Sequence, residues 1–278
     1  MSAVLSWNRY GKSRVRLVKV RRTPERHDVV DLTIDVRLEG AFEPVYVEHD
    51  NRMCLPTDTM KNTVYAFARH DPIEHVEAFC LHLANHFAGK PLVSRVWICA
   101  NEHRWDRLCT GDRPHPHAFV QPGVETWTAL VSRDGAHCEI MSGLTNLVLL
   151  KTTDSAFLGF PRDEFTTLSD AEDRLLATSV TAQWRYQSDM SDFSARAAIR
   201  TALVETFAGH QSRSVQHTLY AMGEAALAAC DAITEITLTL PNRHHLLVDL
   251  QPFGLDNPNE VFVATEQPFG LIEATVRR

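Results

Sequence analysis

The same order of strand-like and helix-like segments occurs in both halves of the chain, and this repeat constrains the fold more than any other feature of the sequence. Each half begins with two segments in which apolar and polar residues alternate, as they do in half-buried strands. Two segments with apolar residues at helical spacing follow, and two more strand-like segments complete the half. The repeat lies in the order of elements, since no residue-by-residue similarity between the halves is evident.

In the first half, Thr57 is expected to cap a helix whose apolar face begins with Met60, and a second helix is expected from Pro72 to near Gly89. The strands of this half are predicted at 15–20, 29–38, 92–100 and 118–131.

In the second half, apolar spacing predicts helices at 194–208 and 214–230. The last two strand-like segments are expected to pair with each other across the polar connection 241–245. The strands of this half are predicted at 144–151, 177–186, 236–240 and 246–250.

Consecutive helices between antiparallel strand pairs indicate an α+β fold rather than a doubly wound parallel sheet. The two halves are expected to form tandem units at residues 10–135 and 136–278. Helices on one face leave the other face of each sheet to be covered, and we expect oligomerisation to cover it.

The charge balance and the absence of long apolar runs exclude two classes of partner. The chain carries 28 Lys plus Arg against 35 Asp plus Glu, a net charge of −7, whereas a general nucleic-acid binder needs a basic surplus. The longest apolar run, 225–230, is far shorter than the roughly 20 residues that span a bilayer. The amino terminus lacks the pattern of a secretion signal, and the six cysteines show no CxxC spacing, so we expect free thiols and a cytoplasmic location.

The fourteen histidines invite a metal hypothesis, which has two candidate clusters. His82 and His86 have the spacing of a zinc-binding helix, but Leu83 occupies the position of the catalytic glutamate, so a solvated helix face is the better interpretation. The second cluster, at positions 103, 115 and 117, is either a metal site or a proline-fixed turn with local hydrogen bonds.

Several stretches, spread in order over nearly the whole chain, resemble the urate oxidase (uricase) family. No single stretch is decisive, but their number and order argue against chance. They are YGK at 10–12, TDTMKNTVY at 57–65, LKTTDSAFLGF at 150–160, RDEFTTL at 162–168, SVQ at 214–216, LPNRHH at 240–245 and NEVF at 259–262.

The resemblance implies two tandem tunnelling-fold (T-fold) units, each an antiparallel sheet with helices on one face, that assemble into a β-barrel tunnel. It implies a homotetramer whose active sites are shared between subunits. The implied reaction is the oxidation of urate by O₂ to 5-hydroxyisourate and H₂O₂, with no metal or organic cofactor. The chain ends Val276-Arg277-Arg278, with no Ser-Lys-Leu peroxisomal signal.

The resemblance also assigns catalytic roles to residues of this chain. Lys12, Thr57 and His244 would form a proton relay, and Thr57 and Asp58 would reach the site from the partner subunit. Motif alignment favours His244 over His245, and strand alternation would send His245 to the opposite face.

The substrate contacts implied by the resemblance are those of a flat anion. Arg174 would clamp urate with its planar fork, Gln216 would pair with the amide edge, and Phe157 would stack on the ring. Asn242 would hold O₂ or water above the ring, and the backbone N–H groups of Asp58 and Val215 would donate further hydrogen bonds.

Two alternatives remain open at the level of sequence. The first is a zinc-dependent T-fold enzyme that acts on a pterin or purine, for which the 103/115/117 cluster is the candidate ligand set. The second is a binding or scaffold protein that has lost catalysis, against which the presence of Lys12, Thr57 and His244 argues.

Overall fold

The computed structural model describes residues 3–188, 190–265 and 267–278, which divide into two units. The first unit contains Met1–Gly143 and Arg185–Ser194, and the second contains Leu144–Trp184 and Ala195–Arg278. The assignment of tandem units to 10–135 and 136–278 stays a prediction. Among the described residues, no helix has both the length and the apolar character needed to cross a membrane.

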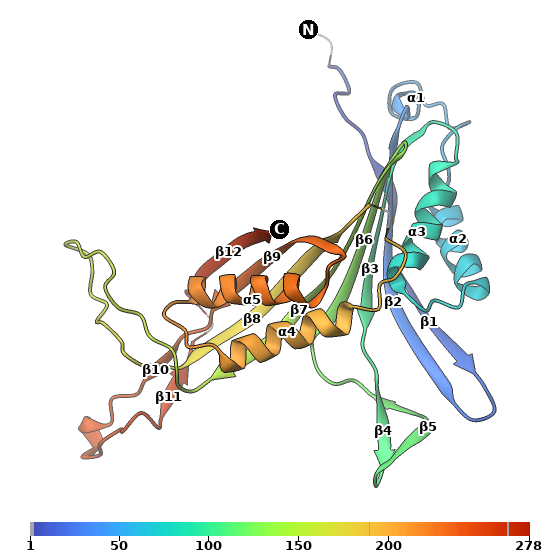
Figure 1. Ribbon diagram of the computed structural model, residues 1–278. Coiled ribbons are helices and arrows are strands. Elements are labelled where there is room, and N and C mark those ends of the chain that lie inside the picture. Colours follow the sequence, from blue (N-terminus) through green and yellow to red (C-terminus); the bar gives the residue numbers. More distant parts are fainter. Residues whose placement is uncertain (1–2, 189, 266) are drawn as a thin grey trace. The chain divides into compact units, whose positions relative to one another are not determined.

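The first unit is built on four strands that pair antiparallel in the order β1 (Tyr10–Arg22), β2 (His27–Gly40), β3 (Val93–His103) and β6 (Thr126–Asp134). Helices α2 (Thr57–His70) and α3 (Val76–Ala88) cover one face of this sheet (Figure 1). Alternation in β2 directs one set of side chains into the core, where all four are fully buried: Leu32, Ile34, Val36 and Leu38.

Two smaller features complete the first unit. The short helix α1 (Glu43–Val47) follows β2, and the hairpin of β4 (Asp106–Thr110) and β5 (Arg113–Val120) follows β3. The single strand predicted at 118–131 is wrong. Residues between β5 and β6 include Gly123 with φ 148°, a backbone conformation that interrupts a strand, so the segment is divided between two strands.

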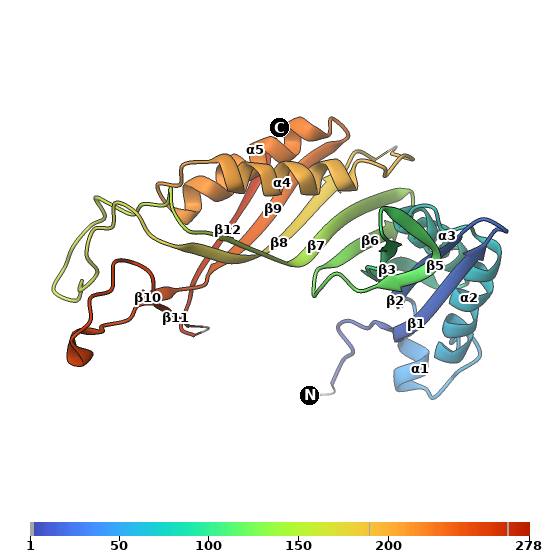
Figure 2. The same ribbon diagram turned by 90° about the horizontal axis from the view of Figure 1, so that it is seen from below.

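The second unit repeats this arrangement with β7 (His137–Lys151), β8 (Leu176–Tyr186), β9 (Ile233–Asn242) and β12 (Gly270–Arg277). Both β7 and β8 also contribute residues to the first unit. Helices α4 (Arg196–Gly209) and α5 (Val215–Ala229) lie together on one face of the second unit's strands (Figures 1 and 2). The core under α5 is formed by apolar residues at helical spacing, all nearly inaccessible: Val215, Leu219, Met222 and Ala226.

The predicted pairing of 236–240 with 246–250 is wrong. Strand β9 pairs antiparallel with β12 over its length, from Asn242 opposite Gly270 to Glu235 opposite Arg277. Instead of turning back after β9, the chain continues into β10 (His245–Leu247), the 3₁₀ turn η1 (Gln251–Phe253) and β11 (Phe262–Ala264), and β10 pairs with β11 in a separate ribbon.

Two helix starts also differ from prediction. Pro56, not Thr57, is the N-cap of α2, and Thr57 is its first helical residue. The second helix begins at Val76 rather than at Pro72, because Ile73 has φ 51° and donates its N–H to the Asp71 carboxylate.

The predicted α+β class with antiparallel pairing is confirmed. Across the described residues no sheet closes on itself, and the T-fold barrel stays a prediction.

Candidate functional site

One cavity of about 310 Å³ in the second unit brings together every site residue predicted from that half of the sequence. The predicted residues on its wall are Phe157, Arg174, Val215, Gln216, Asn242 and His244. The rest of the wall is mostly apolar and consists of Leu168, Ser169, Ala171, Leu175, His245, Leu246 and Ile272.

The cationic wall of the cavity is Arg174. Its guanidinium carbon lies 5.3 Å from the centroid of the Phe157 ring, so the cation sits beside an aromatic face. Its Nε is buried and has no hydrogen-bond partner within the described residues, and burial lowers the pKa of the guanidinium. A desolvated cation with an unused donor favours an anionic ligand.

A second source of positive potential is the start of α5. Ser214 caps this helix, and its Oγ accepts the N–H of His217 at 3.1 Å. Val215 and Gln216 are the first two helical residues, whose N–H groups have no acceptor within the helix. These N–H groups and the helix dipole favour negative charge at this end of the cavity.

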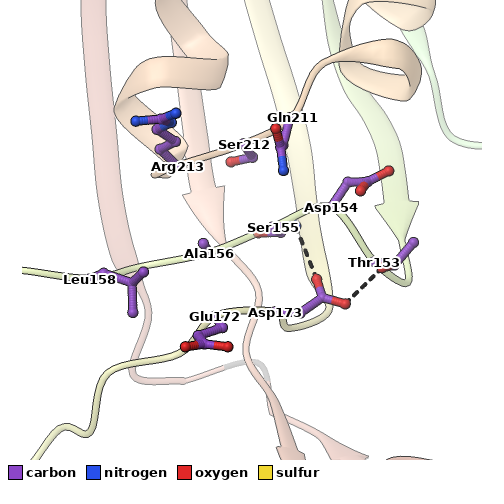
Figure 3. A pocket seen from close by; sticks show the side chains of 10 residues that line it. All are labelled: Thr153, Asp154, Ser155, Ala156, Leu158, Glu172, Asp173, Gln211, Ser212 and Arg213. Atoms are coloured by element: carbon purple, nitrogen blue, oxygen red, sulfur yellow. Dashed lines mark hydrogen bonds between the residues drawn. The ribbon is translucent and has the colours of Figure 1, made fainter.

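The three segments that carry these groups are hydrogen-bonded to one another. Phe157 exchanges two backbone hydrogen bonds with Ala171, at 2.8 and 3.0 Å. Ser155 forms a parallel bridge with Ser212, and Figure 3 shows these two residues on neighbouring segments. The aromatic ring, the guanidinium and the helix start are therefore fixed relative to one another by backbone contacts.

The segment after β9 brings both candidate histidines to the cavity. Asn242 ends the strand, and His244 and His245 both line the wall, so alternation does not send His245 away. The Nδ1 of His245 lies 3.1 Å from the carbonyl oxygen of Arg243. Because a carbonyl only accepts, Nδ1 carries the proton, and Nε2 is the ring's free acceptor in the neutral form.

The remaining predicted residues, Lys12, Thr57 and Asp58, lie in the first unit. Thr57 and Asp58 open α2, where their N–H groups have no helical acceptor. The Asp58 carboxylate accepts hydrogen bonds from Lys61 and, at 3.0 Å, from Asn62. The Lys61 bond is the main cause of the lowered pKa of Asp58, and the charge of Lys12 contributes to it. Strand β1, which carries Lys12, packs against α2.

A β-bulge sets the direction of Lys12. Lys12 pairs with Val36 and Val15 pairs with Ile34, so β1 contains one extra residue between these pairs. Arg14, inside the bulge, has φ 58° and donates its N–H to the Asp35 carboxylate at 2.6 Å. Because directly opposed residues share a face, the bulge places Lys12 on the helix-covered side with the buried Val36.

The family model named Uricase matches residues 8–132 and 140–273 of the chain. The chain is 47% identical over 277 residues to the uricase of Arthrobacter globiformis, covering 99% of this chain and 90% of that protein.

The chain belongs to the uricase family.

Further comparisons agree with membership of the uricase family. The uricase of Aspergillus flavus is 37% identical over 296 residues, covering 100% of this chain and 98% of that protein. The crystal structure of the Arthrobacter globiformis uricase superposes with a TM-score of 0.95 at 46% identity, covering 100% of this chain and 96% of that one. A uricase from Bacillus fastidious, 24% identical with a TM-score of 0.84, shares the fold.

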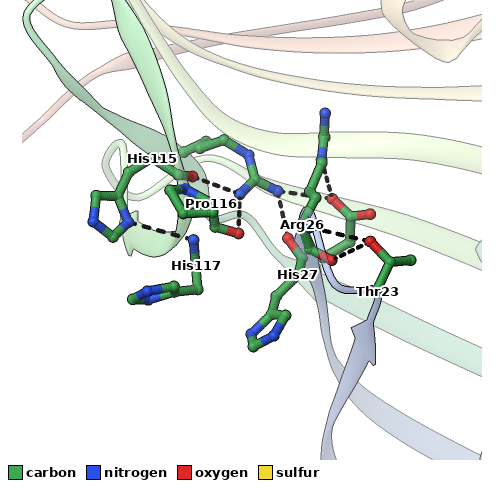
Figure 4. A network of polar contacts seen from close by, with 8 residues as sticks. Thr23, Arg26, His27, His115, Pro116 and His117 are labelled. Carbon is green, nitrogen blue, oxygen red and sulfur yellow. Dashed lines mark hydrogen bonds and ion pairs between the residues drawn. The ribbon is translucent and has the colours of Figure 1, made fainter.

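The histidine clusters that raised the metal hypothesis make local contacts in this uricase-family chain. His82 Nδ1 lies 2.6 Å from the Asp71 carboxylate, and His103 Nε2 lies 2.8 Å from the Thr33 hydroxyl. His115 accepts the N–H of His117 at 3.3 Å in the network of Figure 4. Within the described ranges, no group of three or more His, Cys, Asp or Glu side chains could hold a metal ion.

Sequence reasoning missed the apolar part of the cavity wall in this uricase-family chain, above all Leu168, Leu175 and Ile272. No motif distinguishes these residues from ordinary core or surface positions, because their role depends on where distant segments meet.

Proposed function

We propose that this chain is a urate oxidase that converts urate, O₂ and water to 5-hydroxyisourate and H₂O₂. The observation that carries the proposal is the meeting of Arg174, Phe157 and the start of α5 in one cavity of a uricase-family chain. This cavity combines a flat apolar surface with donors for an anion, and urate is a flat anion with amide edges.

Each binding group has a physical role toward urate. The Arg174 fork donates to the anionic edge, and the N–H of Val215 and the side-chain amide of Gln216 pair with the neighbouring polar edge. Phe157 stacks on the purine, which adds about 1 kcal/mol to the burial of its surface. Asn242 holds O₂ or water against the ring.

The reaction needs no organic cofactor or metal in this proposal, because deprotonated urate is itself electron-rich and can give the first electron to O₂. The protein then removes protons, orients urate and holds O₂ close to the ring. Lys12, Thr57 and His244 form the relay that takes the proton from urate and later handles peroxide or water. The zinc-dependent alternative has no support, since the family match is to uricase.

We further propose a homotetramer of T-fold units that encloses a tunnel, with each active site shared between subunits. Thr57 and Asp58 enter the site from the partner subunit, and Lys12 comes with them because all three residues belong to the first unit of one chain. We also propose a cytoplasmic location, where the six cysteines would stay reduced, and the structure places none of them in a disulfide bond.

The direct test follows the loss of the ultraviolet absorbance of urate, together with H₂O₂ production, in the presence and absence of a metal chelator. Turnover that survives the chelator supports the proposal. Lack of urate turnover refutes the oxidase function, and turnover abolished by the chelator restores the zinc alternative.

A complementation experiment tests the shared site. Thr57→Ala and Arg174→Ala chains are expected to be poorly active alone, and co-expression should recover activity because one chain supplies Thr57 and the other supplies Arg174 to the same site. Recovery that does not exceed the sum of the two variants would contradict sharing between subunits.

A further inference from the structure

We infer that Asp173 is a positioning residue that holds the Arg174 and Phe157 segments in register for urate binding, an inference that rests on the proposed function. Asp173 lies on the wall of a second cavity, of about 540 Å³, on the segment that leads into Arg174. It is absent from the wall of the urate cavity. Its role is therefore exerted through its neighbours.

The Asp173 carboxylate collects donors from two segments. Its Oδ1 accepts the N–H of Ser155 at 3.1 Å and the N–H of Arg174 at 3.0 Å. Its Oδ2 accepts the hydroxyl of Thr153 at 2.6 Å. Figure 3 shows Asp173 pointing toward the segment that contains Thr153 and Ser155. One oxygen thus joins the backbone just before Phe157 to the backbone of Arg174.

The register of the two segments explains why a side chain makes this connection. Phe157 and Ala171 are an antiparallel hydrogen-bonded pair, and the next such pair would be Ser155 and Asp173. The Asp173 carboxylate, in place of its backbone carbonyl, accepts the Ser155 N–H at that position. The side chain therefore adds one hydrogen bond to the Phe157–Ala171 pair, at which the backbone pairing would otherwise end.

The connection reaches the third binding segment as well. Ser155, which is 1% exposed, bridges to Ser212, and the backbone N–H of Ala156 donates to the Ser212 carbonyl at 2.8 Å. Ser212 lies shortly before Gln216 at the start of α5. Loss of the carboxylate would therefore loosen the aromatic ring and the guanidinium directly, and the helix start through Ser155.

The Asp173 side chain itself is exposed to the second cavity. Water can satisfy the exposed Arg174 N–H and Thr153 hydroxyl if the carboxylate is removed, whereas the Ser155 N–H belongs to a residue that is 1% exposed. The folded state should therefore tolerate the change at a modest cost. A residue of this kind affects where Arg174 lies more than whether the chain folds. A positioning role therefore predicts weaker urate binding in a protein that still folds, whereas a general structural role predicts a loss of stability.

The experiment compares Asp173→Ala, Asp173→Asn and Thr153→Val with Glu172→Ala, a matched control that removes the neighbouring carboxylate from the same cavity wall. Asp173→Ala should raise the KM for urate about tenfold or more, with kcat changed much less, because binding in the ground state is lost. Asn keeps an oxygen for the two N–H groups, so Asp173→Asn should restore the KM to within about threefold of wild type. Thr153→Val should give a smaller rise than Asp173→Ala.

Equilibrium dialysis without O₂ measures the dissociation constant of urate and so tests directly whether the rise in KM is a loss of affinity. A double-mutant cycle with Arg174→Ala measures the energetic coupling between Asp173 and Arg174. In the Arg174→Ala background, Asp173→Ala should weaken urate binding by a smaller factor than in wild type, because one of the two groups that it positions is gone. If Asp173→Ala folds poorly, the KM of Thr153→Val is the test: a raised KM supports the inference and an unchanged KM overturns it.

An unchanged KM in Asp173→Ala, equal effects in both backgrounds, a KM for Asp173→Asn as high as that for Asp173→Ala, or an equal effect of Glu172→Ala would overturn the inference. These results leave the oxidase function intact as long as the wild-type protein consumes urate. A wild-type protein that does not consume urate would instead remove the proposed function, and the inference with it.

Discussion

Replacement of Arg174 by alanine should weaken urate binding far more than it slows the chemical step. In the free protein the Arg174 Nε is buried without a hydrogen-bond partner among the described residues, and burial lowers the pKa of the guanidinium. The desolvation cost of this cation is therefore already present before urate arrives. An anion that accepts its donors gains most of the strength of a charge-assisted hydrogen bond.

The expected size follows from that geometry. A hydrogen bond to a charged group contributes about 1.5–3 kcal/mol, and about 1.4 kcal/mol corresponds to a tenfold change in affinity. Loss of one such bond raises the dissociation constant roughly 10- to 150-fold, and loss of a bidentate pair falls at the upper end. The contact between Arg174 and the Phe157 ring, at 5.3 Å, is already made in the free protein, so urate binding does not create it and we expect it to add little to this difference.

Steady-state kinetics and anaerobic urate binding provide the measurement. Arg174→Ala should raise KM and the dissociation constant in parallel, with kcat within about tenfold of wild type. Arg174→Lys keeps the charge but loses the planar fork, so its affinity for urate should lie between that of the wild type and that of Arg174→Ala. The reasoning is refuted if kcat falls as much as affinity, or if Arg174→Lys binds urate as wild type does.

Three further predictions concern catalysis, packing and pH. Lys12→Met should lower kcat by roughly 10²-fold or more with little change in anaerobic urate binding, since general acid–base catalysis contributes at least that much; a parallel loss of binding would contradict the relay role. Gly223→Ala should destabilise the protein by about 1–3 kcal/mol, because the added Cβ would lie 2.5 Å from Cγ2 of Val276, and the double variant with Val276→Ala should melt above Gly223→Ala alone. The hydrogen bond from Thr153 is the first cause of the lowered pKa of Asp173, so the stability due to this carboxylate is present above its ordinary pKa of 3.8 and is lost as the pH falls through the lowered value. The difference in melting temperature between wild type and Asp173→Asn should therefore be constant above the ordinary pKa and shrink below it; a difference that grows on acidification would contradict this.

The repeated order of elements was predictable because burial imposes its period on the sequence. Alternation at 29–38 marks β2, whose inward side chains are fully buried, and apolar spacing marks α3 and α5. The partner of β9 was not predictable in the same way. The segment 246–250 and strand β12 both carry apolar residues, and periodicity describes the face of a strand without naming its neighbour.

Five of the six predicted second-unit site residues lie in the ordered motifs and Arg174 lies outside them, and the cavity wall contains all six. Their roles stay predictions. The two histidines illustrate the limit: alternation separates His244 from His245 only if the strand continues through them, and here β9 ends at Asn242. The contacts of Asp173 could not be predicted from the sequence, because they depend on the register between two separate segments of the chain.

The bulge in β1 has a consequence for how this chain can vary in length. Substitutions at Ser13 or Arg14 change a side chain on the exposed surface of the strand, whereas deletion of either residue removes the extra position between the Lys12 and Val15 pairs. A one-residue change of register moves every preceding side chain to the opposite face. Lys12 would then be intact in the sequence but directed away from the start of α2, so we expect a variant that keeps Lys12, Thr57 and His244 but lacks one residue of the bulge to lose the proposed proton relay.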